Sequence, residues 1–372
     1  MSNAPNSEVQ LEDSSPLLGT VVAVQANYYR VRLDEQQTAD SEGDSVAPHP
    51  LPLAPLLCTR RSRLKKIGQQ VMVGDRVEIE EPDWAGGRGA IANVLSRQTE
   101  IDRPPIANAQ QILLVFALEE PTLDPYQLSR FLVKAESTEL DVCLCLNKSD
   151  LLAPEQLNQW RDRLNIWGYQ PIFISVRSER GIEKISHQLN QKITVIAGPS
   201  GVGKSSLINL LIPTAKLRVG QVSGKLGRGR HTTRHVELFE LPTGGFLADT
   251  PGFNQPDLDC SPEDLAYYFP EARQRLGAAS CQFSDCLHRD EPNCAVSGDW
   301  ERYEHYLEFL EEAIARQEQL NQQADPESNL KLKTKRGGSQ YEPKLETKKY
   351  RRTSRRTQQQ ALQQLYQEPE ES

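Results

Sequence analysis

The chain has 372 residues, enough for two or three domains, and a formal net charge of -8. Charged residues interrupt its apolar stretches well short of the ~20 residues that a spanning helix needs, so the sequence predicts no membrane segment. The first 16 residues are polar and acidic and have neither the plan of a secretory signal nor that of a transit peptide, which favours a cytoplasmic protein.

The net charge hides an asymmetry along the chain. Residues 331–356 contain eleven Lys or Arg and two Glu, a net charge of +9, which leaves -17 for the remainder. Residues 324–372 are also poor in apolar side chains, so this tail is expected to be disordered when free. A basic tail with interleaved tyrosines suggests RNA phosphates as its partner. A tail that serves only solubility is the alternative.

Residues 18–100 are expected to form a small antiparallel barrel of the OB type. Short β-branched runs cover residues 20–24, 28–33, 70–80 around a turn at Gly74-Asp75, and 90–95. The acidic, proline-rich residues 34–55 are expected to form a long surface loop inserted in this barrel. Barrels of this type often bind RNA, although a spacer role is the alternative.

From residue 112 onward, apolar runs alternate with amphipathic helical patterns, which is typical of a parallel α/β layer sandwich. The expected strands are residues 112–118, 142–146, 171–174, 193–197 and 246–248. The expected helices are residues 126–137, 154–167, 181–189 and 204–211. After residue 256 the pattern becomes helix-rich and ends in a long polar helix over residues 299–322.

A complete phosphate-binding loop follows the strand expected at residues 193–197 and precedes a helix. Its glycines let successive backbone N–H groups face phosphate oxygens, Lys204 would reach the β and γ phosphates, and the hydroxyl of Ser205 would bind Mg²⁺. The predicted contacts to GTP or GDP from this loop are Gly198, Pro199, Ser200, Gly201, Val202, Gly203, Lys204, Ser205 and Ser206.

The base-reading element is Asn147-Lys148-Ser149-Asp150, directly after another expected core strand. Asp150 would accept hydrogen bonds from N1–H and the N2 amine of guanine, which adenine does not offer, and Lys148 would lie over the base. Together with the phosphate loop, this motif favours a GTPase over the alternative of a P-loop kinase or ATPase. Ser175 and Val176 occupy the place of a further, weaker guanine motif.

Two polar segments are candidates for the switches that sense the γ-phosphate. Asp249-Thr-Pro-Gly252 resembles the motif whose aspartate holds Mg²⁺ and whose glycine N–H senses the γ-phosphate. Gly229-Arg-His231-Thr232-Thr233 is the candidate first switch. The predicted magnesium ligands are therefore Ser205, Asp249 and one of Thr232 and Thr233, and Gly252 is a predicted GTP contact.

The residue after Gly252 is Phe253, where many GTPases carry the glutamine that orients the attacking water. Intrinsic hydrolysis is therefore expected to be slow. His231 is the candidate catalytic residue that positions water instead. The alternative is that His231 only orders the switch or contacts RNA.

Three cysteines and a histidine crowd into a short stretch near the end of the helix-rich region. Cys281, Cys286, His288 and Cys294 match the ligand set of one closed, tetrahedral, structural zinc site. Asp290 and Glu291 could also ligate, but zinc prefers the fuller thiolate set. The remaining cysteines are interpreted as packing residues: Cys58, Cys143, Cys145 and Cys260.

The guanine motif at Asn147 precedes the phosphate loop at Gly198, which reverses the usual order and indicates a circularly permuted domain. This order, with a barrel before it and a Cys/His cluster after it, resembles the RsgA family of small ribosomal subunit-dependent GTPases over residues 18–312. One departure is Arg234, where the family's first switch usually has a third threonine.

The resemblance implies a multi-domain α/β fold with an N-terminal OB-type barrel, a permuted P-loop GTPase domain and a C-terminal helical zinc domain. The expected segments are a flexible N-terminus (residues 1–17), the barrel (18–100), the GTPase domain (101–255), the zinc domain (256–323) and the basic tail (324–372). It also implies GTP hydrolysis on the small (30S) subunit and its 16S rRNA, in late assembly, by a monomer that carries Zn²⁺ and uses Mg²⁺. A GTP-regulated RNA-binding switch with little turnover is the alternative.

Overall fold

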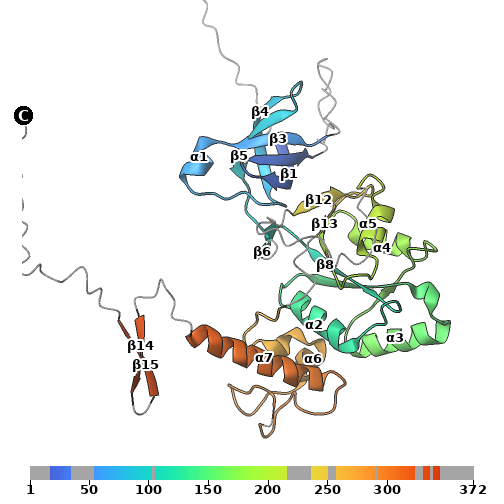
Figure 1. Ribbon diagram of the computed structural model, residues 1–372, viewed down its shortest axis with the longest axis vertical. Helices are drawn as coiled ribbons and strands as arrows, with labels where there is room; N and C mark the ends of the chain where they lie inside the picture. The colour runs from blue at the N-terminus through green and yellow to red at the C-terminus, as the bar shows by residue number, and fades with distance from the viewer. Residues whose placement is uncertain are drawn as a thin grey trace, which may run out of the picture. The chain divides into compact units, whose positions relative to one another are not determined.

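The computed structural model describes residues 17–34, 54–102, 105–215, 236–249, 257–289, 291–322, 330–335 and 338–343 (Figure 1). Residues up to 313 belong to one compact unit and those from 314 onward to a second, and each is described by itself. Among the described residues, no helix has the length and apolar character that crossing a bilayer requires.

The first part of the chain is a barrel of five strands, as the sequence predicts. They are β1 (Leu17–Gln25), β2 (Tyr28–Leu33), β3 (Leu56–Arg60), β4 (Arg76–Asp83) and β5 (Arg88–Val94). They pair in the order β1-β2-β3-β5-β4, and β4 pairs again with β1, which closes the barrel. Because side chains alternate along each strand, Val31, Val77 and Ile91 are fully buried inside.

Two details of the barrel differ from the prediction. The run expected over residues 70–80 has the predicted turn, where Gly74 has φ +89° and lies so close to the carbonyl oxygen of Ala107 that a Cβ would be 2.0 Å away, but it is regular strand only from Arg76 onward. The sequence prediction also lacks β3 and the short helix α1 (Ser62–Lys66). β3 has only two fully buried side chains, Leu56 and Cys58, which is too short an alternation to recognise.

The α/β layer sandwich expected from residue 112 onward is confirmed. Its strands are β8 (Gln111–Ala117), β9 (Asp141–Asn147), β10 (Ile172–Phe173), β11 (Ile193–Ala197), β12 (Glu237–Glu240) and β13 (Phe246–Asp249). They lie in the order β10-β9-β8-β11-β13-β12, with β12 antiparallel and the others parallel. The prediction lacks β12 and the small hairpin of β6 (Glu100–Asp102) and β7 (Pro105–Ala107).

Helices cover both faces of this sheet. They are α2 (Pro125–Glu136), α3 (Pro154–Ile166), α4 (Ile182–Leu189) and α5 (Lys204–Leu211). One buried cluster joins Phe131 of α2 and Leu164 of α3 to the sheet, and a second joins Ile185 of α4 and Leu207 of α5 to it. β8 lies between the two clusters, and all seven of its residues are buried.

The region after residue 256 contains a 3-10 helix η3 (Leu265–Tyr268), α6 (Pro270–Ala278) and α7 (Tyr303–Gln322). Arg302, which is fully buried, lies where this region meets the sandwich, and within the region its Nε donates to Oε1 of Glu271 of α6 at 2.8 Å. Its guanidinium also lies 4.7 Å from the ring centroid of Trp167 and 4.9 Å from that of Phe269.

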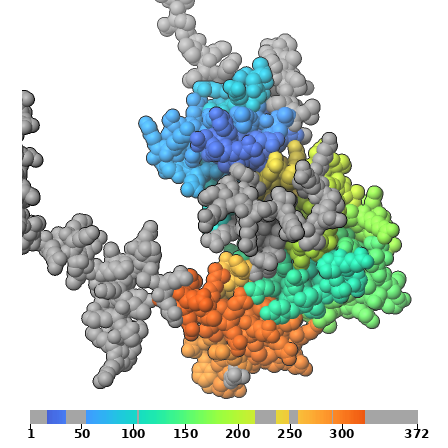
Figure 2. All heavy atoms as spheres, viewed as in Figure 1, coloured from blue at the N-terminus to red at the C-terminus, as the bar shows by residue number. Residues whose placement is uncertain are grey.

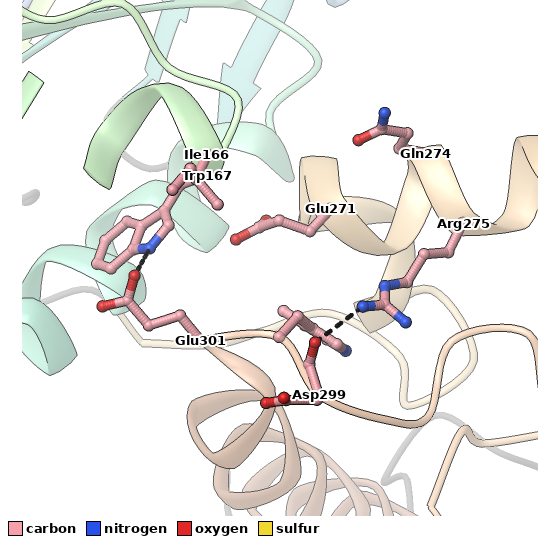
Figure 3. Close-up of a pocket in the computed structure, with 8 residues that line it drawn as sticks. Ile166, Trp167, Glu271, Gln274, Arg275, Asp299 and Glu301 are labelled. Carbon is pink, nitrogen blue, oxygen red and sulfur yellow. Dashed lines mark hydrogen bonds between the residues drawn. The ribbon is translucent and has the colours of Figure 1, made fainter. Parts of the chain in front are cut away.

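Further polar contacts surround this joint. Trp167 Nε1 donates to Glu301 at 2.7 Å (Figure 3), and Arg130 of α2 forms two hydrogen bonds to Glu312 of α7. A cavity of about 440 Å³ opens beside Trp167, with Glu271 and Glu301 in its lining. The helical region is therefore attached to the sandwich by partly exposed ion pairs, by the Trp167–Glu301 hydrogen bond and by the contact of the buried Arg302 with the ring of Trp167.

A two-stranded hairpin lies in the tail for which the composition predicts disorder. β14 (Leu330–Lys335) pairs with β15 (Gly338–Pro343) in a continuous antiparallel register. The local sequence explains the difference, since Leu330, Leu332 and Thr334 alternate with lysines at the period of a strand. Overall composition cannot detect such a short alternation.

Arg302→Ala is expected to destabilise the joint by about 3–5 kcal/mol, because it leaves the buried carboxylate of Glu271 without its cation. Urea unfolding followed by tryptophan fluorescence would report this loss, since Trp167 and Trp300 both lie at the joint. Arg163→Ala is the matched control, because its ion pair with Glu301 has side chains 36% and 37% exposed. Its expected cost is below about 1 kcal/mol. If both variants lost the same free energy of unfolding, burial would not be the reason that the Arg302–Glu271 ion pair stabilises the protein.

Candidate nucleotide and metal sites

The predicted nucleotide motifs come together at one edge of the central sheet. Asn147 ends β9, Gly198 follows β11 directly, and Asp249 ends β13. Because these strands are parallel, their carboxyl ends lie at the same edge, which is where ligands bind in open α/β sheets. The structure therefore unites motifs that lie in permuted order along the chain.

The phosphate loop has the backbone that its glycines permit. Gly198, Gly201 and Gly203 have φ of +137°, +84° and +99°. A Cβ on Gly198 would lie 2.1 Å from the carbonyl oxygen of Val115, and one on Gly203 would lie 2.4 Å from Asn147 Nδ2. The loop leads directly into α5, whose N-terminus adds a positive dipole end to the site.

Lys204 is the first residue of α5 and folds back over the loop. Its Nζ donates to the carbonyl oxygens of Gly198 at 2.7 Å and Pro199 at 2.6 Å. The ammonium group is thereby held beside the backbone N–H groups that would receive phosphate oxygens. Ser205 follows it in the first turn of α5, as a magnesium ligand on this loop would have to.

The amide of Asn147 connects the phosphate loop to the loop after β10. Asn147 is only 2% exposed, its Nδ2 donates to the carbonyl oxygen of Val202 at 2.8 Å, and its Oδ1 accepts from the N–H of Val176 at 3.2 Å. The motif predicted Asn147 as a nucleotide contact. The structure adds a bridging role that the sequence does not indicate.

The base-reading loop is held by its own set of hydrogen bonds. Lys148 has φ +60°, and its Nζ donates to the carbonyl oxygen of Glu120. The N–H of Ser149 donates to Ile174 O at 3.0 Å. A hydrogen bond from the Ser175 side chain lowers the pKa of Asp150 below its ordinary value, so the base-reading carboxylate has a partner in the loop after β10.

Several predicted residues lie outside the described part of the chain. They are His231, Thr232, Thr233, Arg234, Gly252 and Phe253. Asp249 is described by its backbone, which pairs with Ile196 of β11 on one side and with Glu237 of β12 on the other. This register puts Asp249 beside the strand that leads into the phosphate loop.

The four predicted metal ligands form one compact cluster, although no sheet or long helix organises them. Their ligand atoms lie within 4.8 Å of one another. His288 Nδ1 lies 3.5, 3.4 and 3.4 Å from the sulfurs of Cys281, Cys286 and Cys294. A tetrahedral zinc site with ordinary bond lengths requires N···S separations of about 3.6 Å, so the donors fit such an ion.

The surroundings of the cluster support a closed structural site. The N–H groups of Ala295 and Ser297 donate to the sulfurs of Cys281 and Cys294 at 3.4 and 3.3 Å. Glu291, the alternative ligand, instead accepts hydrogen bonds from the N–H groups of Leu287 and Arg289. Asp290 lies outside the described residues.

Three of the other cysteines behave as packing residues. Cys58, Cys143 and Cys145 are buried, and burial raises the pKa of Cys58 to about 12 and that of Cys143 to about 11. Such thiols are poor nucleophiles and poor ligands. Cys260 is partly buried and does not belong to the cluster.

The sheet order, the phosphate loop and the guanine motif that precedes it in sequence define a circularly permuted P-loop GTPase with an N-terminal β-barrel. A family model described as RsgA GTPase matches residues 93–259. "Small ribosomal subunit biogenesis GTPase RsgA 1" of Nostoc sp. is 74% identical over 362 residues, covering 95% of this chain and 98% of that protein.

Two solved structures agree with this assignment. YjeQ from Thermotoga maritima has 33% identity and a TM-score of 0.64, covering 81% of this chain and 100% of its own. YloQ, described as a circularly permuted GTPase, has 31% identity and a TM-score of 0.64, covering 82% and 98%. The chain belongs to the RsgA GTPase family and is an enzyme that hydrolyses GTP. The alternative of a P-loop kinase or ATPase is therefore wrong.

Gly203→Ala is expected to lower the affinity for GDP by at least about tenfold, because the new Cβ would collide with Asn147 and the backbone would be strained. Fluorescence titration with N-methylanthraniloyl-GDP (mant-GDP) would measure this. Gly68→Ala is the matched control, since Gly68 has φ +70° but nothing within 4 Å of its Cβ position. Wild-type GDP affinity in Gly203→Ala would contradict the described loop geometry.

Cys286→Ser is expected to reduce the bound metal from one ion per chain to nearly none, because a closed site loses one of its thiolates. Elemental analysis of the purified protein would measure this and identify the metal. Cys260→Ser removes a partly buried thiol outside the cluster and should leave the metal content unchanged. Full metal content in Cys286→Ser would exclude Cys286 as a ligand.

Proposed function

We propose that the protein hydrolyses GTP to GDP and phosphate when it is bound to the small (30S) ribosomal subunit, as a late-stage assembly factor. One observation carries this proposal: the permuted nucleotide motifs meet at one sheet edge in a chain that is 74% identical to a protein named as a small ribosomal subunit biogenesis GTPase. In this proposal the protein acts as a monomer in the cytoplasm and has the domain boundaries that the sequence predicts.

In this proposal the guanine base is recognised by residues 147–150 with Ser175 and Val176. The phosphates are held by residues 198–206, and the N–H of Gly252 senses the γ-phosphate. Two observations support these roles: Lys204 Nζ lies against the loop carbonyls, and Ser175 forms a hydrogen bond with Asp150, which lowers the pKa of that carboxyl. Lys148 would lie over the base from a position fixed by Glu120.

Mg²⁺ would neutralise charge on the β and γ phosphates. The proposed ligands are Ser205, Asp249 and one of Thr232 and Thr233. Asp249 ends β13, and Ser205 lies in the first turn of α5, directly after the phosphate loop that follows the neighbouring strand β11, which supports a shared ion. Arg234 stands where the family usually has a third threonine. Mutation of Thr232 and of Thr233, one at a time, would show which of the two binds Mg²⁺.

We assign water positioning to His231, because Phe253 has no group that can orient water. Near neutral pH, a histidine can accept a proton from the attacking water, or it can hold that water in place by a hydrogen bond. The missing glutamine also supports the second candidate, a GTP-regulated RNA-binding switch with little turnover. Subunit-stimulated turnover separates the two.

Zn²⁺ is proposed as the ion at Cys281, Cys286, His288 and Cys294, since three thiolates and one imidazole are a typical structural zinc set. The 16S rRNA is proposed as the partner of the barrel and of the basic residues 331–356. Exposed cations on α1, Arg63, Lys65 and Lys66, support a polyanionic partner for the barrel.

Purified protein is expected to hydrolyse GTP slowly alone and much faster with small ribosomal subunits, with no stimulated hydrolysis of ATP. Steady-state phosphate release at saturating nucleotide measures this. If the protein binds GTP but subunits do not stimulate its turnover, the switch is favoured.

If His231→Ala keeps full subunit-stimulated turnover, His231 is not the catalytic residue. Truncation after Ala324 with unchanged subunit affinity and salt dependence would remove the role of the tail in RNA binding.

A further inference from the structure

A single cross-strand row connects the barrel to the nucleotide edge of the sheet. In this row Arg30 of β2 pairs with Ala23 of β1, and Ala23 pairs with Glu237 of β12. Glu237 in turn pairs with Asp249 of β13, and Asp249 pairs with Ile196 of β11. The row therefore runs from the barrel to the proposed magnesium aspartate without leaving the backbone ladder. β12 lies against β1 in Figure 2 as well.

Arg30 and Glu237 also interact through their side chains. Nη1 of Arg30 donates to Oε1 of Glu237 at 3.0 Å, although the two residues belong to strands two places apart in the sheet. Two strand spacings amount to about 10 Å, so long side chains must extend across the strand between them. The residue between them is Ala23, whose methyl group leaves room for this contact.

We propose that Arg30 is a positioning residue for nucleotide-bound Mg²⁺: through Glu237 it holds β12 against β13 and so fixes the backbone of Asp249. This inference rests on the magnesium role of Asp249 in the proposed function. It goes beyond that function because it makes an arginine of the barrel part of the support for the GTPase site. The barrel then influences the nucleotide site through the sheet itself.

The location of Glu237 explains why this ion pair would matter more than most exposed ones. Its side chain is 46% exposed and that of Arg30 is 42% exposed, so water screens the attraction. However, Glu237 is the first residue of a strand of four residues, and β1 meets β12 at this single described pair. The backbone pairing of β12 to the barrel is thus confined to the Glu237 end of the strand, beside Val236 and Leu238, which are buried in the core.

A second ion pair supplies a matched control. Nε of Arg32 of β2 lies 3.0 Å from Oε2 of Glu240 of β12. This second arginine–glutamate pair joins the same two strands as the first. Glu240 pairs with Phe246, and Phe246 pairs with Ile193 at the amino end of β11. This pair therefore lies at the end of the sheet that is remote from Asp249 and from the phosphate loop.

The test measures the release of mant-GDP from the full-length protein at increasing Mg²⁺, without ribosomes. Arg30→Glu is expected to raise the Mg²⁺ concentration for half-maximal slowing of release by about two- to fivefold, the size of effect that a partly exposed ion pair supports. Release in EDTA should not change. The double variant Arg30→Glu with Glu237→Arg should restore the wild-type Mg²⁺ dependence, whereas Arg32→Glu should leave it unchanged.

Two outcomes would overturn the inference. One is a wild-type Mg²⁺ dependence in Arg30→Glu, and the other is an equal shift in Arg32→Glu, which would indicate a general loosening of the barrel. Asp249→Asn separates these outcomes from a failure of the proposed function. If Asp249→Asn leaves the Mg²⁺ dependence unchanged, the magnesium role of Asp249 is wrong. If it shifts the dependence and Arg30→Glu does not, only the role of Arg30 is wrong.

Discussion

The nucleotide site depends on the buried amide of Asn147. This side chain uses its N–H to hold the phosphate loop at Val202 and its carbonyl oxygen to hold the loop after β10 at Val176. Leaving a buried amide group without a hydrogen-bond partner costs roughly 1–3 kcal/mol. Movement of either loop would break one of these bonds, so the amide favours one fixed distance between the two loops. The phosphate-binding and base-reading elements thus behave as one unit, although about fifty residues separate them in the chain.

This contact also explains why a permuted order of motifs is compatible with an ordinary GTPase site. The site requires that β9, β8, β11 and β13 lie side by side and parallel, and their register provides this. The positions of Asn147, Gly198 and Asp249 in the sheet do not depend on the order in which the chain connects the strands. Permutation instead changes the neighbours of the site. β12 contacts the barrel, and the helical region with the Cys/His cluster follows β13 in the sequence.

The sequence predicted the central sheet and the motifs well, because long buried strands and glycine loops leave strong local patterns. β8 is buried on both faces and reads as an unbroken apolar run. The missing parts depend on partners far away in sequence. β12 is four residues long and begins and ends with a glutamate, Glu237 and Glu240, whose partners Arg30 and Arg32 lie about two hundred residues earlier. Similarly, no local pattern indicates that Arg302 is buried against Glu271.

The metal cluster and the Arg302 joint have separate roles in the C-terminal region. All four candidate ligands come from the chain, so a tetrahedral ion bound by them would have no open position for chemistry and its role would be structural. The cluster orders a stretch with little regular structure, and the hydroxyls of Tyr303 and Tyr306 hold its carbonyls at residues 287–289. Arg302 then attaches this ordered region to α3 through Trp167. The Cys/His cluster and the buried arginine thus act at different places: the cluster lies in the stretch before α7, and the arginine fixes the region to the GTPase domain.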